Sequence, residues 1–490
     1  MKRRDIVGLV VCAALGACVG PNFQRPAPPH VERYTAEPLP AATASAAGPG
    51  GAAQRFLADQ DVPRDWWKLF CSDEIDALVR EALRANPDVR SAQAALRQAL
   101  ENTAAQRGSY FPTVQGSFDA TRNLDATGVL APNLASGTAL YNLYTPQVTV
   151  SYVPDVFGAN RRQVESLAAQ AEASRYALDA TYLTLTANVV TAAIQEAGLR
   201  AQITATEQVI ALEREALSVL RRELELGAIA EGDVFAQDAA LAQLEGTLAP
   251  LNRQLQQTRD SLAVLTGHLP AELKPLHFEL EQLVLPVDLP LGVPSQLVER
   301  RPDVRAAEAQ LHAATAQVGV AIANLLPQLT ITGNIGSTAT LLSDLFNGGT
   351  GFWSIGVNAT QTLFAGGTLI HRKRAADAAL DQAGAMYKSA VLTAFQNVAD
   401  ALHALDTDAD ALNAASRAAS ASQKSLDVAR RRLELGSVSY LALVNAEQTY
   451  LQAMVSLAQA RANRYADTAA LFQALGGSVT PIAAGAPRTE

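Results

Sequence analysis

Cysteine is scarce in this chain of 490 residues, which contains only three. Two of them, Cys12 and Cys18, lie near the N-terminus, so Cys71 has no partner in the rest of the chain. This distribution excludes a framework of disulfide bonds. The fold must therefore depend on packing, and an apolar content of 49% is enough to bury one large core or several.

Positive charge is also in deficit. Lysine and arginine number 39 against 48 acidic residues, which gives a net charge of −9. Outside the N-terminus, no run of basic residues is long enough to hold a phosphate backbone. Nucleic acid is therefore not an expected partner.

Sequence motifs of catalysis are missing as well. The chain has no Walker A sequence, no H-E-x-x-H and no G-x-S-x-G, and its six histidines are scattered. Three methionines, Met1 included, offer no relay for a soft metal ion. We expect neither an enzyme nor a bound metal or cofactor.

The N-terminus has the pattern of an export signal. Basic residues at Lys2–Arg4 precede an apolar run from Ile6 to Leu15 that is too short to cross a bilayer as a stable helix. Leu-Gly-Ala-Cys, which ends at Cys18, resembles a bacterial lipobox, and this predicts a signal peptide over 1–17 and a lipidated (palmitoylated) Cys18. The alternative is an ordinary signal with a small-residue cleavage site. By the same resemblance, Val19 favours the outer membrane over the inner one.

Residues 18–72 are predicted to be an N-terminal tether anchored by that lipid. The segment up to about residue 65 is rich in Pro, Ala and Gly and cannot order itself as a domain. We expect it to lie along another part of the molecule. The aromatic stretch "DWWKLF" at its end is expected to pack against the helices that follow.

The rest of the chain is an internal repeat. "NPDVRSAQAAL" at Asn86 corresponds to "RPDVRAAEAQL" at Arg301, and two "LELG" segments end at Gly227 and Gly436, 209 positions apart. The internal duplication divides the chain into a first repeat over 73–281, a second repeat over 282–476 and a tail over 477–490.

Each repeat changes its hydrophobic period twice. Helical stripes over 73–110 and 297–326 end near Pro112 and Pro327. Alternating apolar and polar residues then predict two strands in each repeat. The predicted strands are about 113–123, 146–157, 328–338 and 352–364, joined by loops at about 124–143 and 339–350.

Long helical segments without proline follow each pair of strands, over 159–226 and 367–435. Each could reach roughly 100 Å, and the helices that follow, about 230–266 and 438–475, are half as long. We expect Gly227 and Gly436 to cap the long helices in the left-handed conformation, with arginine in the last turn facing the negative end of the helix dipole. The chain then turns back along itself, and 267–296 makes the connection.

Four strands cannot close a barrel, and an open sheet edge in lipid costs several kcal/mol for each unsatisfied backbone group. Strands of about ten residues with one apolar face have the length of tilted transmembrane strands. We therefore predict a mixed α and β membrane protein in which three chains build a twelve-stranded β-barrel.

Taken in order, these features resemble the TolC-like outer-membrane efflux channels, in the lipoprotein branch that serves RND-type pumps. The resemblance is carried by the lipobox with "VGPNFQRPAPP", by "DWWKLF", by the paired "PDVR" helices and by the twin "LELG" tips. It implies a homotrimer whose barrel is continuous with a long α-helical barrel across the periplasm. A periplasmic adaptor (membrane fusion) protein and an inner-membrane RND-type pump would open the closed tip. The implied function is passive export of small amphiphilic compounds or drugs.

The resemblance also implies a gate near the tips, where the family places acidic residues a few positions after the tip glycine. Asp233 matches one such position, whereas Ala442 and Asn445 replace acids in the second hairpin. Asn445 with either Leu441 or Leu443 is then expected to form a neutral constriction. The other candidates, for contacts between subunits or with the adaptor, are Gly227, Gly436, Glu231, Arg221, Arg222, Arg430 and Arg431.

Two other functions fit this pattern in whole or in part. A structural lipoprotein that bridges the envelope would need the coiled coils but not the alternating strands. A channel for type I protein secretion would share every feature.

Overall fold

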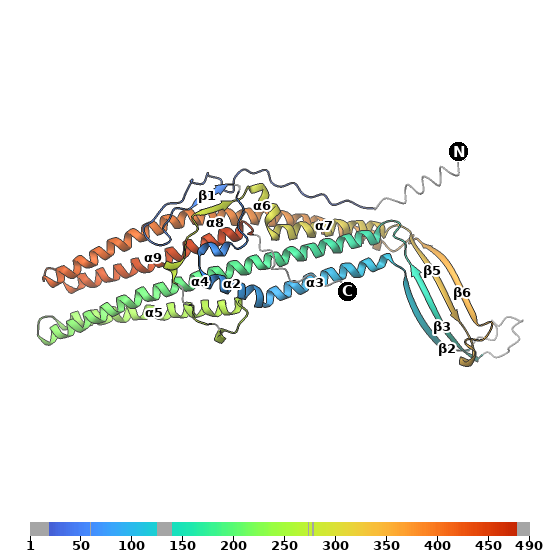
Figure 1. The fold of residues 1–490 in the computed structure, drawn as a ribbon, viewed down its shortest axis with the longest axis horizontal. Coiled ribbons are helices and arrows are strands. Elements are labelled where there is room, and N and C mark those ends of the chain that lie inside the picture. Colours follow the sequence, from blue (N-terminus) through green and yellow to red (C-terminus); the bar gives the residue numbers. More distant parts are fainter. Residues whose placement is uncertain (1–18, 59, 125–139, 273, 277–278, 478–490) are drawn as a thin grey trace. The chain divides into compact units, whose positions relative to one another are not determined.

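The structure, a computed structural model of the chain, describes residues 19–58, 60–124, 140–272, 274–276 and 279–477. These residues form two compact units. The first comprises 19–25, 96–173 and 307–387, and the second comprises 26–95, 174–306 and 388–477. Figure 1 traces the helices and strands of both. The predicted signal peptide, Cys18 and the tail beyond residue 477 lie outside the described residues.

The first unit contains an antiparallel sheet with the strand order β2-β3-β5-β6, so β2 and β6 are its edge strands. The strands are β2 (Thr113–Leu124), β3 (Leu140–Tyr152), β5 (Gln328–Ser337) and β6 (Gly351–Thr360). The short helix η2 (Gly108–Tyr110) precedes β2, and η5 (Leu342–Asp344) lies in the loop between β5 and β6.

The register of this sheet sorts its side chains by polarity. One row across the four strands is polar and consists of Gln115, Thr149, Asn334 and Ser354. The adjacent row is apolar apart from its glycine and consists of Gly116, Val148, Ile335 and Trp353. Because neighbouring rows face opposite sides of a sheet, one face is polar and the other apolar. The apolar face is exposed in the single chain, where Trp353 keeps 74% of its surface.

Two strands differ from the predicted limits. β3 begins at Leu140, six residues before the predicted start at 146, and ends at Tyr152, five residues before the predicted end at 157. It continues through Pro146, which lies opposite Phe118. Pro146 has no N–H, and on the other side of β3 the ladder with β5 starts only at Gln147. β6 ends at Thr360 rather than near 364, because Thr360 lies opposite the first residue of β5 and Pro327 cannot extend that strand.

Four helices make two hairpins of equal size. The long helices α4 (Ala159–Glu225) and α8 (Thr368–Glu434) have 67 residues each, and α5 (Glu231–Leu265) and α9 (Tyr440–Ala474) have 35. These limits agree with the predicted ones to within two residues. An 18-residue stretch of α4 is apolar enough to cross a membrane, but 56% of it is buried within the chain, as in the core of a helical bundle.

The helical stripe predicted to begin each repeat is broken in two. The first is divided into α2 (Asp73–Ala85) and α3 (Pro87–Arg107), and the second into α6 (Pro294–Arg300) and α7 (Pro302–Ala323). The residues between them are extended, with ψ of 130° at Asn86 and 122° at Arg301. A proline disfavours the helical conformation in the residue before it, so the "PDVR" segments start new helices.

The N-terminal segment is tied to the second unit. Its strand β1 (Arg55–Ala58) pairs in parallel with β4 (Asp288–Leu291), a pairing that sequence analysis did not predict. The fully buried guanidinium of Arg464 in α9 donates to Thr43 Oγ1 at 3.0 Å and to the Ala52 carbonyl at 2.7 Å. Short helices η3 (Pro270–Glu272) and η4 (Leu280–Gln282) lie in the connection before β4.

The aromatic stretch forms the short helix η1 (Trp66–Phe70) and belongs to the core of the second unit. Trp66 and Phe70 have no exposed surface, and the Trp66 ring lies 5.4 Å from that of Phe472 in α9. The predicted packing of "DWWKLF" against a helix is therefore confirmed.

Candidate gate at the helical tips

Both hairpins of the second unit turn with the same hydrogen bonds. Gly227 has φ of +72° and Gly436 has φ of +66°, the left-handed conformation that sequence analysis predicted for both. At the first tip the N–H of Gly227 donates to Leu224 and that of Ala228 to Glu223. At the second tip the N–H of Gly436 donates to the Leu433 carbonyl and that of Ser437 to the Arg432 carbonyl. This is the Schellman motif, which satisfies carbonyls at the end of a helix.

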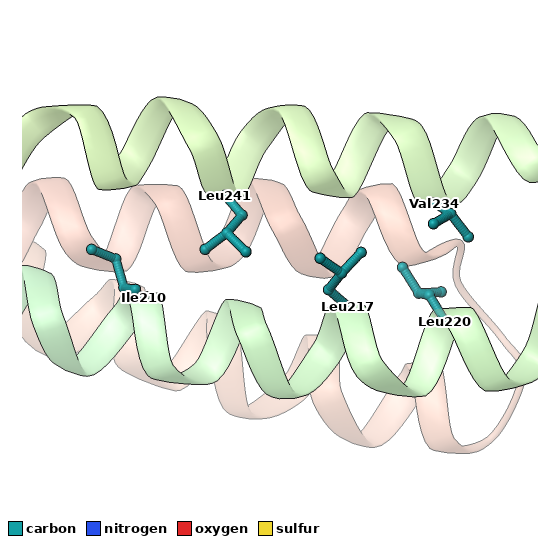
Figure 2. Packing of buried hydrophobic residues seen from close by; sticks show 5 residues of the cluster. All are labelled: Ile210, Leu217, Leu220, Val234 and Leu241. Atoms are coloured by element: carbon teal, nitrogen blue, oxygen red, sulfur yellow. The ribbon is translucent and has the colours of Figure 1, made fainter.

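An apolar core holds the first hairpin together up to its tip (Figure 2). Ile210, Leu217 and Leu220 of α4 point toward Val234 and Leu241 of α5, and all five are at least 92% buried. Ion pairs flank this core on the surface. Arg221 lies 3.3 Å from Asp238 across the hairpin, and Arg222 lies 2.9 Å from Glu225 one turn along α4.

Asp233 lies in the first turn of α5 and is exposed. Its backbone N–H donates to the Ala230 carbonyl at 3.1 Å. Glu231 is the first residue of the same helix and is also exposed. Two exposed acidic groups therefore stand at the positive end of the α5 dipole.

The second tip separates the two leucine candidates. Leu441 is 62% exposed, and Asn445, one helical turn later, is exposed on the same face of α9. Leu443 is only 6% exposed and belongs to the core of the hairpin. Of the two leucines predicted as alternatives for the constriction, Leu441 is therefore the one whose side chain faces out of the chain. Ala442 is partly buried and carries no charge.

Arg431 is exposed, whereas its neighbour Arg430 is half-buried and interacts with a buried group. Its guanidinium lies 3.4 Å from Glu447 of α9, a carboxyl that is 98% buried. The carboxyl of Glu213 in α4, which is 99% buried, acts on that of Glu447, and Glu213 accepts a hydrogen bond from the amide of Gln237. Sequence analysis missed this cluster, although Glu213 stands seven residues before Leu220 in the apolar stripe of α4 and so breaks the stripe with a charge.

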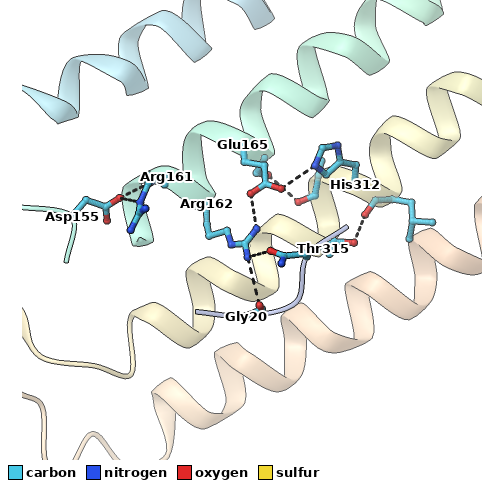
Figure 3. A network of polar contacts seen from close by, with 11 residues as sticks. Gly20, Asp155, Arg161, Arg162, Glu165, His312 and Thr315 are labelled. Atoms are coloured by element: carbon cyan, nitrogen blue, oxygen red, sulfur yellow. Dashed lines mark hydrogen bonds and ion pairs between the residues drawn. The ribbon is translucent and has the colours of Figure 1, made fainter. Parts of the chain in front are cut away.

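Another polar cluster holds the residues that follow Cys18 (Figure 3). Arg162 of α4 is 96% buried and donates to Asn22 Oδ1 at 2.6 Å and to Glu165 Oε2 at 2.7 Å. Glu165 Oε1 lies 3.0 Å from His312 Nε2, and the His312 ring stacks on Phe23. Burial acts to raise the pKa of Glu165, but the hydrogen bonds from Arg162 and His312 outweigh it and hold the pKa below its usual value.

Glycine is required where this segment crosses α7. A side chain at Gly319 would meet the Arg162 aliphatic stem at 2.9 Å, and one at Gly20 would meet the Gly319 backbone at 2.5 Å. The residues after the predicted lipidation site are therefore fastened to α4 and α7 of the first unit.

Known proteins share this architecture. A sequence model of the family described as outer membrane efflux protein matches residues 78–268 and 293–477. The outer membrane protein OprJ of Pseudomonas aeruginosa is 28% identical over 475 residues, which cover 96% of this chain and 95% of OprJ. The cation efflux system protein CusC of Escherichia coli K12 is 25% identical over 471 residues, 96% of this chain and 98% of CusC.

A solved structure agrees with these sequence relatives. The outer-membrane channel OprN is similar with a TM-score of 0.82 and 29% identity, over 94% of this chain and 99% of that one. The sequence model covers well over half of the 490 residues. The chain therefore belongs to the outer membrane efflux protein family, and it is an efflux channel of the outer membrane.

Proposed function

We propose that three copies of this efflux channel assemble into one conduit, with a twelve-stranded barrel in the outer membrane and an α-helical barrel in the periplasm. The four-stranded sheet carries the proposal. Its apolar face is exposed over several strands, its other face is polar, and its edge strands β2 and β6 end the ladder. Pairing β6 of one chain with β2 of the next satisfies both edges and turns the apolar faces to lipid.

The internal duplication is supported by contacts at matching positions. The side-chain amide of Asn86 donates to the last residue of α5, Leu265, at 2.9 Å. The guanidinium of Arg301 donates to the last residue of α9, Ala474, at 2.9 Å. The family's sequence model also matches two segments, one in each repeat. A duplicated chain places two similar hairpins in every subunit, so three chains would supply six to a helical barrel.

Mass measurement tests the assembly directly. Detergent-purified protein examined by size-exclusion chromatography with multi-angle light scattering should have three times the mass of the chain, and electron micrographs should show a hollow axis. A folded protein that remains monomeric without such an axis would refute the proposed assembly.

The relatives are outer-membrane parts of efflux pumps, so this channel works with an adaptor and an inner-membrane pump. We infer that the pump is of the RND type and that the cargo is small and amphiphilic. CusC is named as part of a cation efflux system, but this chain has only three methionines to offer a soft cation. Export of organic compounds is therefore the favoured function. In a strain that lacks its own efflux channels, expression with the cognate pump and adaptor should raise resistance to organic inhibitors and leave copper and silver tolerance unchanged.

The gate is proposed at the tips, with Asp233 on the first hairpin and Leu441 with Asn445 on the second. Purified channel in a planar bilayer should conduct weakly, and Asp233→Ala should raise the conductance by removing a charge that narrows the entrance. Asp238→Ala changes an exposed carboxylate of the same helix, five residues farther from the tip, and serves as the control. An unchanged conductance in Asp233→Ala would remove Asp233 from the gate.

Lipidation of Cys18 is proposed from the lipobox. The hydrogen bond from Arg162 to Asn22 and the stacking of Phe23 on His312 support this proposal, because they hold the residues that follow the lipidation site in place. Globomycin, or Cys18→Ser, should leave uncleaved precursor in the membrane fraction. Normal cleavage in both cases would indicate an ordinary signal peptide instead.

A further inference from the structure

Two buried carboxyl groups meet where the two helical hairpins of one chain are in contact. Glu213 in α4 is 1% exposed and Glu447 in α9 is 2% exposed, and the Glu213 carboxyl acts on that of Glu447. Glu213 lies fourteen residues before Gly227 and Glu447 eleven after Gly436. At a rise of 1.5 Å per residue, the contact is roughly 20 Å from either tip. It is therefore placed to connect the proposed gate hairpins.

Each of the four helices supplies one group to this cluster. The Gln237 amide of α5 donates to Glu213, and Arg430 of α8 lies 3.4 Å from Glu447 Oε1. Among the described residues, Glu447 Oε2 and Gln237 Oε1 are buried without a hydrogen-bond partner. The charged groups that act on Glu447 are Glu213 from α4 and Arg430 from α8.

The charges in the cluster do not balance when both carboxyls are ionised. Two buried carboxylates in contact repel each other strongly, and a single guanidinium neutralises only one. A proton held between the carboxyls removes the repulsion and turns the contact into a hydrogen bond. A metal ion is a poorer solution, because the described residues include no group of three or more side chains arranged to bind one.

We propose that a proton shared by Glu213 and Glu447 joins the two hairpins of each chain, and that loss of this proton releases the joint. Glu213 and Gln237 belong to the first hairpin, while Glu447 and Arg430 belong to the second. A hydrogen bond formed by the shared proton thus crosses from one hairpin to the other. The joint itself follows from this geometry, and only its effect on conduction rests on the proposed gate.

The direction of the pH dependence follows from the pKa of Glu447. Burial raises it, the neighbouring Glu213 raises it further, and Arg430 only partly offsets them, so it lies at about 7 rather than the usual 4.5. Between pH 4.5 and pH 7, the joined state therefore binds more protons than the separated state. The joint is strongest below pH 4.5 and weakens as the pH rises through 7, by at most tenfold in its equilibrium constant per pH unit for one proton.

The chain contains a matched control for this joint. Arg221 and Asp238 occupy the positions of Arg430 and Glu447 in the other hairpin, each 209 residues earlier. Their ion pair is 3.3 Å long, similar to the 3.4 Å of its counterpart, but both side chains are about 60% exposed. Asp238 therefore has the same kind of partner without the buried second carboxyl, and its neutralisation should not affect the joint.

The experiment measures the separation of the hairpins in the full-length channel. Spin labels at Ala228→Cys and Ser437→Cys, in a Cys71→Ser background, report the distance between the two tips by pulsed electron paramagnetic resonance from pH 5 to 8.5. The short-distance population should dominate at pH 5 and fall as the pH passes 7. Glu447→Gln and Glu213→Gln should each abolish that change, whereas Asp238→Asn should keep it.

Three outcomes would overturn the proposal. They are a tip separation that does not change with pH in the parent protein, a change that persists in Glu447→Gln, and an equal loss of the change in Asp238→Asn. A fourth arm adds EDTA at pH 5, and separation of the tips on chelation would show that a divalent cation, not a proton, joins the carboxyls. Circular dichroism of each variant verifies that the helices are intact.

Bilayer conductance of the same variants distinguishes this proposal from the proposed gate. If the tips separate at high pH while conductance stays constant, the joint exists and the gate lies elsewhere. If the tips do not respond to pH but Asp233→Ala raises conductance, the gate stands and the joint is refuted.

Discussion

The two helical hairpins of this chain carry equivalent ion pairs in different surroundings. Arg221 with Asp238 and Arg430 with Glu447 lie 209 residues apart at matching positions, and their separations of 3.3 and 3.4 Å differ little. Both side chains of the first pair are exposed, whereas Glu447 of the second is 98% buried. The two hairpins therefore match in backbone and in the type of ion pair, and they differ in the burial of the carboxyl.

The packing of the hairpins offers the largest test of this divergence. Leu220 is 98% buried between α4 and α5, and alanine occupies the matching position, Ala429, in the second hairpin. Leu220→Ala gives the first hairpin the residue that the second has at this position. It should lower the free energy of unfolding by about 2–5 kcal/mol, because apolar burial is lost and a cavity remains. Thermal unfolding followed by circular dichroism should show a clear fall in midpoint.

Glu215→Ala is the control for that substitution, since Glu215 lies on the exposed face of the same helix. It should change stability by less than about 0.5 kcal/mol. Equal effects of the two substitutions would mean that the core near the tip does not stabilise the first hairpin.

The ion pairs themselves are the next test. Arg430→Ala leaves the buried Glu447 beside Glu213 without its cation, and losing a hydrogen bond to a charged group of this kind costs about 1.5–3 kcal/mol. Arg221→Ala removes an exposed pair that is worth about 0–1 kcal/mol. Thermal midpoints at pH 8, where Glu447 tends to ionise, should separate the two variants most clearly. Similar midpoints for both would show that burial has not changed the role of the second pair.

Sequence patterns predicted the hairpins well because proline, glycine and apolar spacing are local signals. The long helices lie within two residues of their predicted limits, and both tip glycines have the predicted conformation. The helix breaks at Asn86 and Arg301 also have a local signal, because a proline follows each of these residues. Sequence analysis missed them because the Ala-rich pattern on both sides favours one continuous helix.

Long-range partners were less accessible to sequence reasoning. β1 pairs with β4 across more than two hundred residues, and no periodicity in either short segment indicates the other. The contact between Glu213 and Glu447 has the same difficulty, because each glutamate alone resembles a charge on a helix surface. Only the interruption of an apolar stripe marked Glu213 as a buried residue.

The tip glycines test whether the two backbones are equivalent. Alanine in the left-handed conformation costs about 1–2 kcal/mol, and no atom lies within 4 Å of a Cβ added to Gly227 or Gly436. Gly227→Ala and Gly436→Ala should therefore lower stability by the same amount, from backbone strain alone. Asparagine, which tolerates this conformation better, should restore part of the loss at both sites. A large difference between the two alanine variants would show that the tips are not equivalent.

The smallest expected effect concerns the helix that starts after each tip. Asp233 stands in the first turn of α5, whose first turn also contains Glu231, whereas the first turn of α9 has no acidic residue and Ala442 occupies the matching position. Neither Ala230 nor Ser439 caps its helix with a side-chain hydrogen bond, so the charges near the N-terminus act without competition. An acidic group there stabilises the helix by about 0.3–1 kcal/mol at low salt.

Asp233→Asn should therefore speed amide hydrogen exchange in the first turn of α5 by about two- to fivefold, and Ala442→Asp should slow it in α9 by a similar factor. Both effects should largely vanish in 1 M salt, where the Debye length falls to about 3 Å. An effect of Asp233→Asn that persists at high salt would mean that Asp233 makes a specific contact rather than interacting with the helix dipole, which is the behaviour expected of a gate residue held by a neighbouring subunit.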